Sequence, residues 1–291
     1  MVRLAVILLN YRNPGDTLEC LRSLARAGAT ASNAKIFLVN NFPQDGSGAP
    51  LLDFLKSAPF LFDYQEPEVN TGFAGGCNLG IREALKENFS TIVLLNNDTV
   101  VEPNFIEEAR RLAGEHPDDI LAGLVRETGT GKMDHNIGRI SRWTGRVHHI
   151  FDPEYQGEID FVSGCLMIIP RDVLTKTGGF DEGLFMYAED LDLSMRFKKA
   201  GAPMRYCPSI LVHHKFSASA KASGLPKEYY IQRNQTYVIL RRGRPVQRLF
   251  YLLSLLALPF YKAVRYPKFF RQAVTGAWDG IWGRLGQVGQ G

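Results

Sequence analysis

The sequence predicts an α/β fold with a mixed, mostly parallel central sheet, helices on its faces and a helical extension at the C-terminus. In the first half, short apolar runs alternate with helical patterns, which is typical of parallel strands joined by crossover helices. The composition is that of an ordinary globular protein, since 45% of the 291 residues are hydrophobic and 22% are charged. We expect one large α/β domain over 1–225 and a distinct helical region over 226–291.

Apolar runs bounded by turn residues predict the individual strands, and apolar spacing with end signals predicts the helices. The predicted strands are Leu4–Leu9, Lys35–Val39, Thr91–Leu95, Phe161–Ile169 and Met204–Cys207. The predicted helices run from Asp16, as N-cap, to Ala27, from Phe73 to Glu87, from Pro103 to Glu115 and from Glu189 to Lys199. Residues 126–158 are expected to form a loop or hairpin over a cleft, and 217–224 a mobile loop.

Cysteine usage and the N-terminal residues predict a cytoplasmic protein. Four cysteines, Cys20, Cys77, Cys165 and Cys207, lie far apart without CxxC spacing. They are therefore expected to be reduced, buried thiols, not a zinc site or a disulfide framework. The run Leu4–Leu9 is too short for the apolar part of a signal peptide and is better explained as a first strand.

Charge is distributed unevenly along the chain. Residues 226–291 hold 11 Lys and Arg against 2 acidic residues, whereas the whole chain carries +4. The same region contains the apolar run Leu249–Phe260, which is shorter than the ~18–20 residues that span a bilayer. An apolar run with basic flanks predicts a helix lying in an anionic membrane surface, and a core or dimer helix is the alternative. Nucleic acid is a poorer partner, because it gives the apolar run no role.

Asp98 is the first candidate site residue. Asn96, Asn97 and Asp98 follow the apolar run that ends at Leu95, and ligands of open α/β sheets collect at the carboxyl ends of strands. A carboxylate together with diphosphate oxygens suits a hard divalent cation. Such a cation would neutralise the charge that develops on a departing nucleotide diphosphate. The alternative is a plain turn after a strand.

Glu189, Asp190 and Asp192 place three acids in the first turn of a predicted helix. Acids are common there because the helix dipole favours them. The functional alternative is a general base that removes the proton of an acceptor hydroxyl as it attacks an anomeric carbon. A glycoside hydrolase also needs an acid for its leaving group, whereas transfer from a nucleotide sugar does not.

Two further motifs are candidates for binding. His213 and His214 follow a short apolar stretch, and a neutral imidazole there would complete a metal site; the alternative is two ordinary strand-end histidines. Residues 70–78 form a glycine-rich entry to a helix, where backbone N–H groups suit phosphate; the alternative is a turn and cap. This stretch does not match the dinucleotide-binding pattern.

In this order and spacing the motifs resemble the family 2 glycosyltransferases, in particular their rhamnosyltransferase-like branch. The resemblance covers about residues 3–240. It rests on Val6–Tyr11, Val39–Asn41 with Asp45–Ser47, Asn70–Asn78, Asn96–Asp98, Gly164, Gly179–Glu182 through Glu189–Leu193, His213, and Tyr230 with Arg233 and Asn234. It implies a GT-A (nucleotide-diphospho-sugar transferase) fold.

The resemblance also implies residue roles. Asn10 and Tyr11 would line the base pocket, together with Asn40, which stands where the family usually has Asp. Asn70, Gly72, Asn78, Asn96 and Asn97 would contact the nucleotide sugar, and Gly164 would leave room for the sugar. Asp98 and His213 would bind Mg²⁺ or Mn²⁺, with His214 as the alternative ligand. Asp190 would be the base, and Glu189 would help to orient a substrate.

These implications predict an inverting glycosyltransferase of cell-surface polysaccharide synthesis. Its donor would be dTDP-L-rhamnose or a UDP-hexose, and its acceptor a glycan or lipid-linked sugar. It would act as a peripheral protein at the inner face of the cell membrane. Both a monomer and a homo-oligomer are compatible with the sequence. The alternatives are a non-catalytic glycan-binding protein and a sugar nucleotidyltransferase. The second fits poorly, because residues 10–15 lack its phosphate loop.

Overall fold

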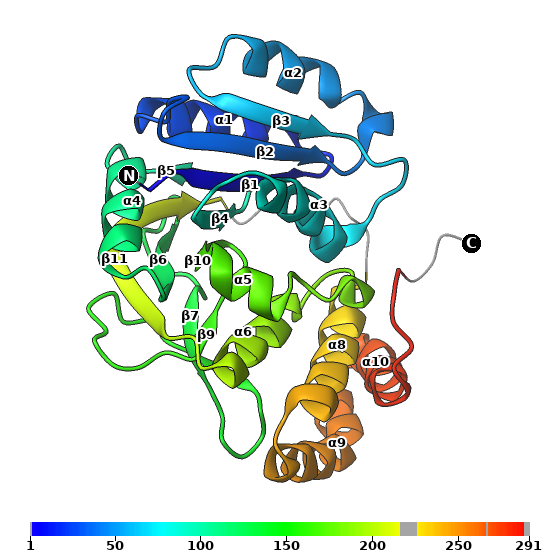
Figure 1. Ribbon diagram of the computed structural model, residues 1–291. Helices are drawn as coiled ribbons and strands as arrows, with labels where there is room; N and C mark the ends of the chain where they lie inside the picture. The colour runs from blue at the N-terminus through cyan, green and yellow to red at the C-terminus, as the bar shows by residue number, and fades with distance from the viewer. Residues whose placement is uncertain (1, 216–225, 266, 288–291) are drawn as a thin grey trace.

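The computed structural model describes residues 2–215, 226–265 and 267–287; the predicted mobile loop at 217–224 lies outside them. The central sheet has eight strands in the order β3-β2-β1-β4-β10-β6-β11-β5 (Figure 1). These strands are β1 (Leu4–Asn10), β2 (Ala34–Asn40), β3 (Leu61–Gln65), β4 (Thr91–Leu95), β5 (Thr99–Val101), β6 (Ile120–Glu127), β10 (Leu166–Pro170) and β11 (Met204–His214).

The sheet is mixed and mostly parallel, as predicted. Strands β3, β2, β1 and β4 run parallel, and β11 runs parallel to β6. Strand β10 is antiparallel to β4 and β6, and β5 is antiparallel to β11. A second sheet has the order β8-β7-β9 and consists of β7 (Ile137–Ile140), β8 (Val147–His149) and β9 (Phe161–Val162). Its β7–β8 hairpin occupies part of the region predicted as a loop or hairpin.

Helices cover both faces of the central sheet. One face is covered by α1 (Pro14–Arg26), α2 (Gly48–Lys56) and α4 (Phe105–Glu115), and the other by α3 (Gly72–Lys86), α5 (Arg171–Thr177) and α6 (Glu189–Ala200). Strand β1 shows why: Leu4, Val6 and Leu8 belong to the first core, while Ala5 and Ile7 belong to the second. Alternate residues of a strand point to opposite faces, so a fully apolar strand needs cover on both.

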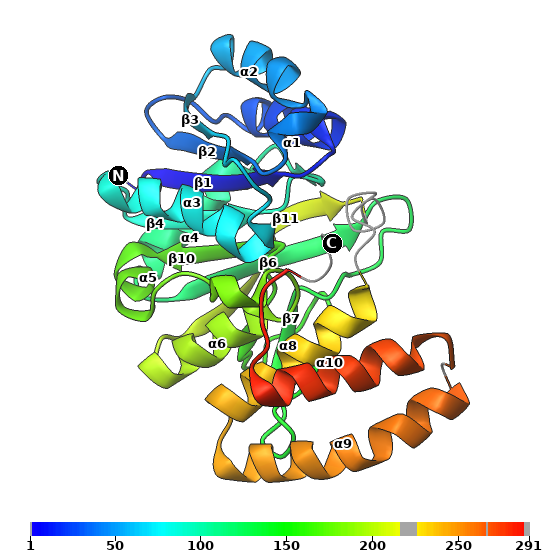
Figure 2. The same cartoon turned by 90° about the vertical axis from the view of Figure 1, so that its right-hand side faces the viewer.

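Three long helices form the C-terminal region: α8 (Lys227–Arg242), α9 (Pro245–Arg265) and α10 (Phe270–Trp282). They gather beside α6, with α8 between α6 and the other two (Figure 2). Among the described residues, no helix combines the length and the apolar character that crossing a bilayer requires.

Three predicted elements differ from the structure. Helix α1 has Asn13 as its N-cap, because Pro14 occupies the favoured first position; Asp16 instead lies in the first turn. The strand predicted over 161–169 is split between β9 and β10, since the chain turns at residues 163–165. The strand predicted to end at Cys207 continues to His214, with a register shift between Cys207 and Leu211 where Pro208 cannot donate a ladder bond.

Candidate active site

A cavity of about 280 Å³ opens where β1, β2 and β4 end. Its walls come from the residues after these strands, the start of α3, the turn between β9 and β10, and the start of α6. Nine residues predicted as site residues line it: Tyr11, Asn70, Gly72, Asn96, Asn97, Asp98, Gly164, Glu189 and Asp190. Segments far apart in sequence therefore meet where α/β sheets bind ligands.

Asp98 lies in the cavity wall opposite a histidine. Its carboxylate is buried, and Asp98 Oδ1 lies 3.2 Å from His214 Nε2. The other ring nitrogen, Nδ1, lies 2.7 Å from Asp134 Oδ2, so Asp134 sets the orientation of the ring. Burial lowers the pKa of His214, but Cys165, Asp134 and Asp98 together raise it above its usual value. When no metal ion is bound, these neighbours therefore favour the protonated ring of His214, and a metal ion bound there would replace that proton.

The two histidines diverge because they are successive residues of β11. His213 Nε2 lies 2.6 Å from Glu102 Oε1, on the side of β5, while His214 faces Asp98. The structure thus brings the alternative ligand, His214, and not His213 to the carboxylate.

Of the predicted base-pocket residues, one lines the cavity and two lie behind its wall. Tyr11 lines the cavity and packs edge-on against Phe42, at 5.8 Å between ring centroids. Asn10 and Asn40 are fully buried behind it and bond to each other, with 2.8 Å from Asn10 Nδ2 to Asn40 Oδ1. Asn40 also donates to Glu66 at 3.0 Å. Their amides are occupied within the protein, so Asn10 and Asn40 support the ends of β1 and β2.

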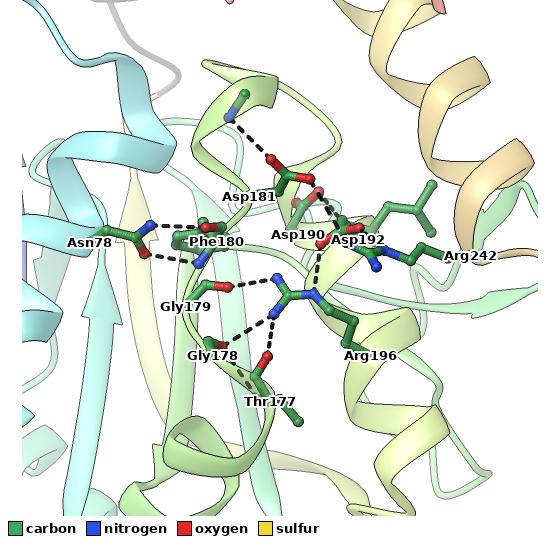
Figure 3. A network of polar contacts seen from close by, with 12 residues as sticks. Asn78, Thr177, Gly178, Gly179, Phe180, Asp181, Asp190, Asp192, Arg196 and Arg242 are labelled. Carbon is green, nitrogen blue, oxygen red and sulfur yellow. Dashed lines mark hydrogen bonds and ion pairs between the residues drawn. The ribbon is translucent and has the colours of Figure 1, made fainter. Parts of the chain in front are cut away.

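The glycine-rich segment approaches the loop before α6. Gly72 has a φ of 72°, and a Cβ there would lie 2.4 Å from the carbonyl oxygen of Phe185. The N–H of Ala74 donates to that carbonyl oxygen at 3.1 Å. Asn78 lies outside the cavity lining and forms two bonds of 2.9 Å with the backbone of Phe180 (Figure 3). Asn78 therefore supports the segment at Phe180, and its contact with the nucleotide stays a prediction.

The acidic pair follows an unusual backbone turn. Phe185, Tyr187 and Ala188 have φ angles of 64°, 70° and 62°. Side chains disfavour this region, at a cost of about 1–3 kcal/mol per residue, and such positions cluster at functional sites. The turn directs both acids inward: Glu189 and Asp190 line the cavity at the start of α6.

Glu189 and Asp190 have different surroundings. Asp190 Oδ1 accepts from the N–H of Leu191 at 2.8 Å and Oδ2 from the N–H of Gly164 at 3.4 Å. The buried Oε2 of Glu189 has no hydrogen-bond partner in the described protein. Burial and the charge of Asp190 raise the pKa of Glu189 well above its usual range. Burial also raises the pKa of Asp190, although its backbone bonds oppose the rise.

Comparison with known proteins decides the family. The family model described as Glycosyl transferase family 2 matches residues 5–178. The chain belongs to this family. The glycosyltransferase is similar to the low-salt glycan biosynthesis hexosyltransferase Agl10 of Haloferax volcanii, with 22% identity over 98% of this chain and 92% of that protein.

Two more similarities concern a further relative and the fold. An N-acetylglucosaminyl-diphospho-decaprenol L-rhamnosyltransferase of Mycobacterium tuberculosis is 36% identical over 28% of this chain and 26% of its own length. The solved structure of GalNAc-T7 with UDP, GalNAc and Mn²⁺ superposes with a TM-score of 0.64 at 14% identity, covering 97% of this chain and 55% of that one. The glycosyltransferase therefore has the GT-A fold predicted from its motifs.

Several cavity residues of the glycosyltransferase were not predicted from its sequence. Asn41 lines the cavity and holds the start of α3, donating to Gly72 O at 2.9 Å and accepting from Thr71 N at 3.0 Å. Asn41 could have been predicted from the sequence, because it directly follows Asn40 at the end of a predicted strand. The remaining unpredicted lining residues are Leu9, Phe73, Ser163, Cys165, Met186 and Tyr187. The contact of Asp134 with His214 could not be predicted, because Asp134 lies in an irregular segment far from His214 in sequence.

The Asp98 region fits a divalent cation only if the substrate supplies ligands. Within residues 2–215, 226–265 and 267–287, no three His, Cys, Asp or Glu side chains are arranged to hold a metal ion. Mg²⁺ is commonly bound by one or two carboxylates together with substrate phosphates. Asp98 and His214 supply two candidate ligands, and Asp134 provides the orienting carboxylate that metal-binding histidines usually have.

Proposed function

We propose that this glycosyltransferase moves a sugar from a nucleotide diphosphate to an acceptor hydroxyl with inversion at the anomeric carbon. The observation that carries the proposal is that Asp98 and Asp190 line the same cavity, each held by its own partners. One carboxylate serves the diphosphate and the other the acceptor. Inversion needs only one base on the face opposite the leaving group, and Asp190 is that base.

The proposed step begins with the acceptor hydroxyl at Asp190. Asp190 takes the hydroxyl proton as the oxygen bonds to the anomeric carbon, and the bond to the nucleotide diphosphate breaks on the opposite face. The N–H groups of Leu191 and Gly164 fix the orientation of the carboxylate. Glu189, with its unpartnered buried oxygen, bonds a sugar hydroxyl of donor or acceptor.

Asp98 and His214 would hold Mg²⁺ or Mn²⁺ against the diphosphate, with His213 as the second candidate. The ion supplies neutralisation of the charge that develops on the leaving group. Tyr11, Asn70, Gly72, Asn96 and Asn97 line the same cavity as Asp98 and Asp190. In the proposed complex Tyr11 contacts the base, and the other four contact the nucleotide sugar. One relative is named as a hexosyltransferase of glycan biosynthesis and another as an L-rhamnosyltransferase, so their names support a hexose or L-rhamnose as the transferred sugar. The donor that we propose is dTDP-L-rhamnose or a UDP-hexose, and the acceptor is a glycan or lipid-linked sugar in polysaccharide synthesis.

We further propose that the C-terminal region, residues 226–291, binds an anionic membrane surface. Helices α9 and α10 border an apolar groove of about 360 Å³, and Leu253, Leu256 and Trp278 on it are more than half exposed. Exposed basic residues near both ends of α9 include Arg241, Arg244, Arg248, Lys268 and Arg271. Cationic ends around an apolar face complement anionic headgroups around hydrocarbon. The glycosyltransferase would then act at the inner face of the cell membrane.

Liposome sedimentation tests this membrane proposal. The protein is expected to sediment with phosphatidylglycerol vesicles, less in high salt, because salt screens exposed charges. Leu256→Asp should reduce sedimentation, whereas Leu61→Asp, at an exposed leucine of β3, should not. Equal recovery in the supernatant with and without vesicles would contradict the proposal. If ultracentrifugation instead shows a dimer that Leu256→Asp disrupts, the apolar face binds a second copy of the chain and not a membrane.

Donor hydrolysis tests the proposed reaction. The purified protein is incubated with Mn²⁺ or Mg²⁺ and a panel of dTDP- and UDP-sugars, and released nucleotide diphosphate is measured. Release from one donor, lost in Asp98→Ala, is the expected result. If no donor is cleaved even with membrane lipid extract as acceptor source, the protein is a binding protein and the proposed reaction is wrong.

A further inference from the structure

Two fully buried polar residues of α8, Arg233 and Asn234, point at the backbone of the turn before α6. Asn234 Nδ2 lies 2.8, 2.8 and 2.7 Å from the carbonyl oxygens of Leu184, Met186 and Tyr187, so its two N–H groups are shared among three acceptors. Arg233 Nη2 donates to Leu184 O at 3.1 Å, and its Nε donates to Asn234 Oδ1 at 2.8 Å. Burying such groups is favourable only with partners, and the turn supplies them.

The turn depends on these bonds because its own backbone is unfavourable. Phe185, Tyr187 and Ala188 are non-glycine residues at positive φ, so the turn would relax if its carbonyl groups were released. Met186 and Tyr187 line the cavity, and Glu189 begins α6 immediately after the turn. A change in the turn would therefore move the acidic pair.

Helix α8 is packed closely against α10, so it is a fixed support for the turn. Gly276 and Gly280 of α10 contact its backbone so closely that a Cβ would lie 2.5 Å from Tyr229 O and 2.3 Å from Arg233 O. Arg233 Nη1 donates to Gly286 O at 2.7 Å, and the Gly286 N–H donates to Gly183 O at 2.8 Å. The segment after α10 thus contacts both α8 and the residue immediately before the turn.

A second set of hydrogen bonds joins α8 to α6, the helix that carries Glu189 and Asp190. Asp192 of α6 is fully buried and accepts from Arg242 Nε at 2.7 Å and from Arg196 Nε at 2.7 Å (Figure 3). Asp192 is two residues beyond Asp190 and does not line the cavity. Both the turn before α6 and the first turn of α6 are therefore bonded to α8.

We infer that Asn234 and Arg233 are positioning residues, which hold the Leu184–Ala188 turn so that Asp190 and Glu189 face the substrate. The inference rests on the proposed function for its consequence in catalysis, but the contact it describes is testable without activity. It also makes α8 part of the catalytic unit, although α8 lies in the C-terminal region.

The test compares Asn234→Ala with Gln247→Ala. Gln247 is a matched control, a buried amide that donates to Ser141 O at 2.8 Å, far from the turn in sequence. Hydrogen exchange of residues 183–190 is measured in both variants. Exchange should become at least ~10-fold faster in Asn234→Ala only, because local opening becomes easier.

The kinetic readout separates positioning from a general loss of fold. With the donor that the wild type cleaves, kcat of Asn234→Ala should fall ~10–100-fold while KM for the donor changes little, since a displacement of about 1 Å has that effect. Asn234→Gln, which keeps the amide donor, should recover part of the rate. If Asn234→Ala does not fold, Asn234→Ser replaces it in the same measurements of exchange and kcat.

Three outcomes overturn the inference. Unchanged exchange in residues 183–190 would show that Asn234 does not hold the turn. Faster exchange with unchanged kcat would show that the turn does not position the acids. A parallel loss of rate in Gln247→Ala would make the effect a general loss of stability. If the wild type cleaves no donor, the proposed function fails, and faster exchange still identifies the contact.

Discussion

Asp98 and His214 face each other across 3.2 Å, and Asp134 holds the far side of the imidazole at 2.7 Å. The adjacent His213 turns away to Glu102. A histidine oriented by a carboxylate beside a second carboxylate is the arrangement expected for a metal ligand. The pair that binds the ion would then be Asp98 and His214.

The first prediction distinguishes the two histidines. His214→Ala should weaken Mn²⁺-dependent binding of UDP or dTDP at least ~10-fold, because loss of a ligand or its orienting group has that effect. His213→Ala should bind within about 2-fold of the wild type, a difference of less than about 0.5 kcal/mol. Calorimetric titration with and without Mn²⁺ measures both variants. The reverse ranking would assign the metal to His213.

The second prediction concerns the base. Asp190→Asn should fold normally, bind nucleotide normally and lose at least ~10²-fold in rate, the usual scale for a general base. Asp172→Asn, at an exposed acid in the first turn of α5, is the control and should keep its rate. Nucleotide release is measured together with a melting curve. Near-normal turnover by a folded Asp190→Asn would remove Asp190 from the mechanism.

The third prediction is a pH profile. Burial raises the pKa of Asp190, and the base acts only when deprotonated. The rate should therefore be lost as pH falls through this raised value, at a higher pH than the ~3.9 of a free aspartate. The profile of kcat at saturating Mn²⁺ and donor measures it. An acid limb that stays at the ordinary aspartate value, or that persists in Asp190→Asn, would assign the titration to another group.

The fourth prediction tests the close contact of α8 and α10. Gly280→Ala should destabilise the protein by about 1–3 kcal/mol, because the new Cβ would lie 2.3 Å from Arg233 O and the helices must separate. Gly114→Ala in α4 is the matched helical control, since its nearest neighbour is Val2 Cγ2 at 3.6 Å. It should be neutral or stabilising by up to about 1 kcal/mol. Chemical denaturation measures both; equal stability would contradict the described contact.

Much of the fold could be predicted because its signals are local. Thr91–Leu95 is a strand over its predicted range, and the predicted helix over 73–87 is α3 within one residue at each end. The split of the strand over 161–169 was missed, because a continuous apolar run does not reveal which of two sheets each half joins. Helix α2 and strand β3 were also missed. The division at residue 225 stays a prediction.

The site was predicted unevenly, for a physical reason. Residues that follow strand ends, such as Asp98, are brought to the cavity by topology alone. Asn10 and Asn40 also end strands, but their amides bond each other and lie behind the cavity wall. The choice between His213 and His214 depends on the face of β11 that each occupies, and register is set by pairing with β6 and β5. The supporting contacts of Asn234 depend on distant helices.

The stereochemistry of the product tests the central claim most directly. The donor found in the hydrolysis panel is incubated with enzyme, and proton NMR records the anomeric configuration of the first sugar released, before it equilibrates. A single base opposite the leaving group predicts inversion, so an α-linked donor yields the β-sugar first. Release of the same anomer as the donor would contradict the role of Asp190 and require a different mechanism in this cavity.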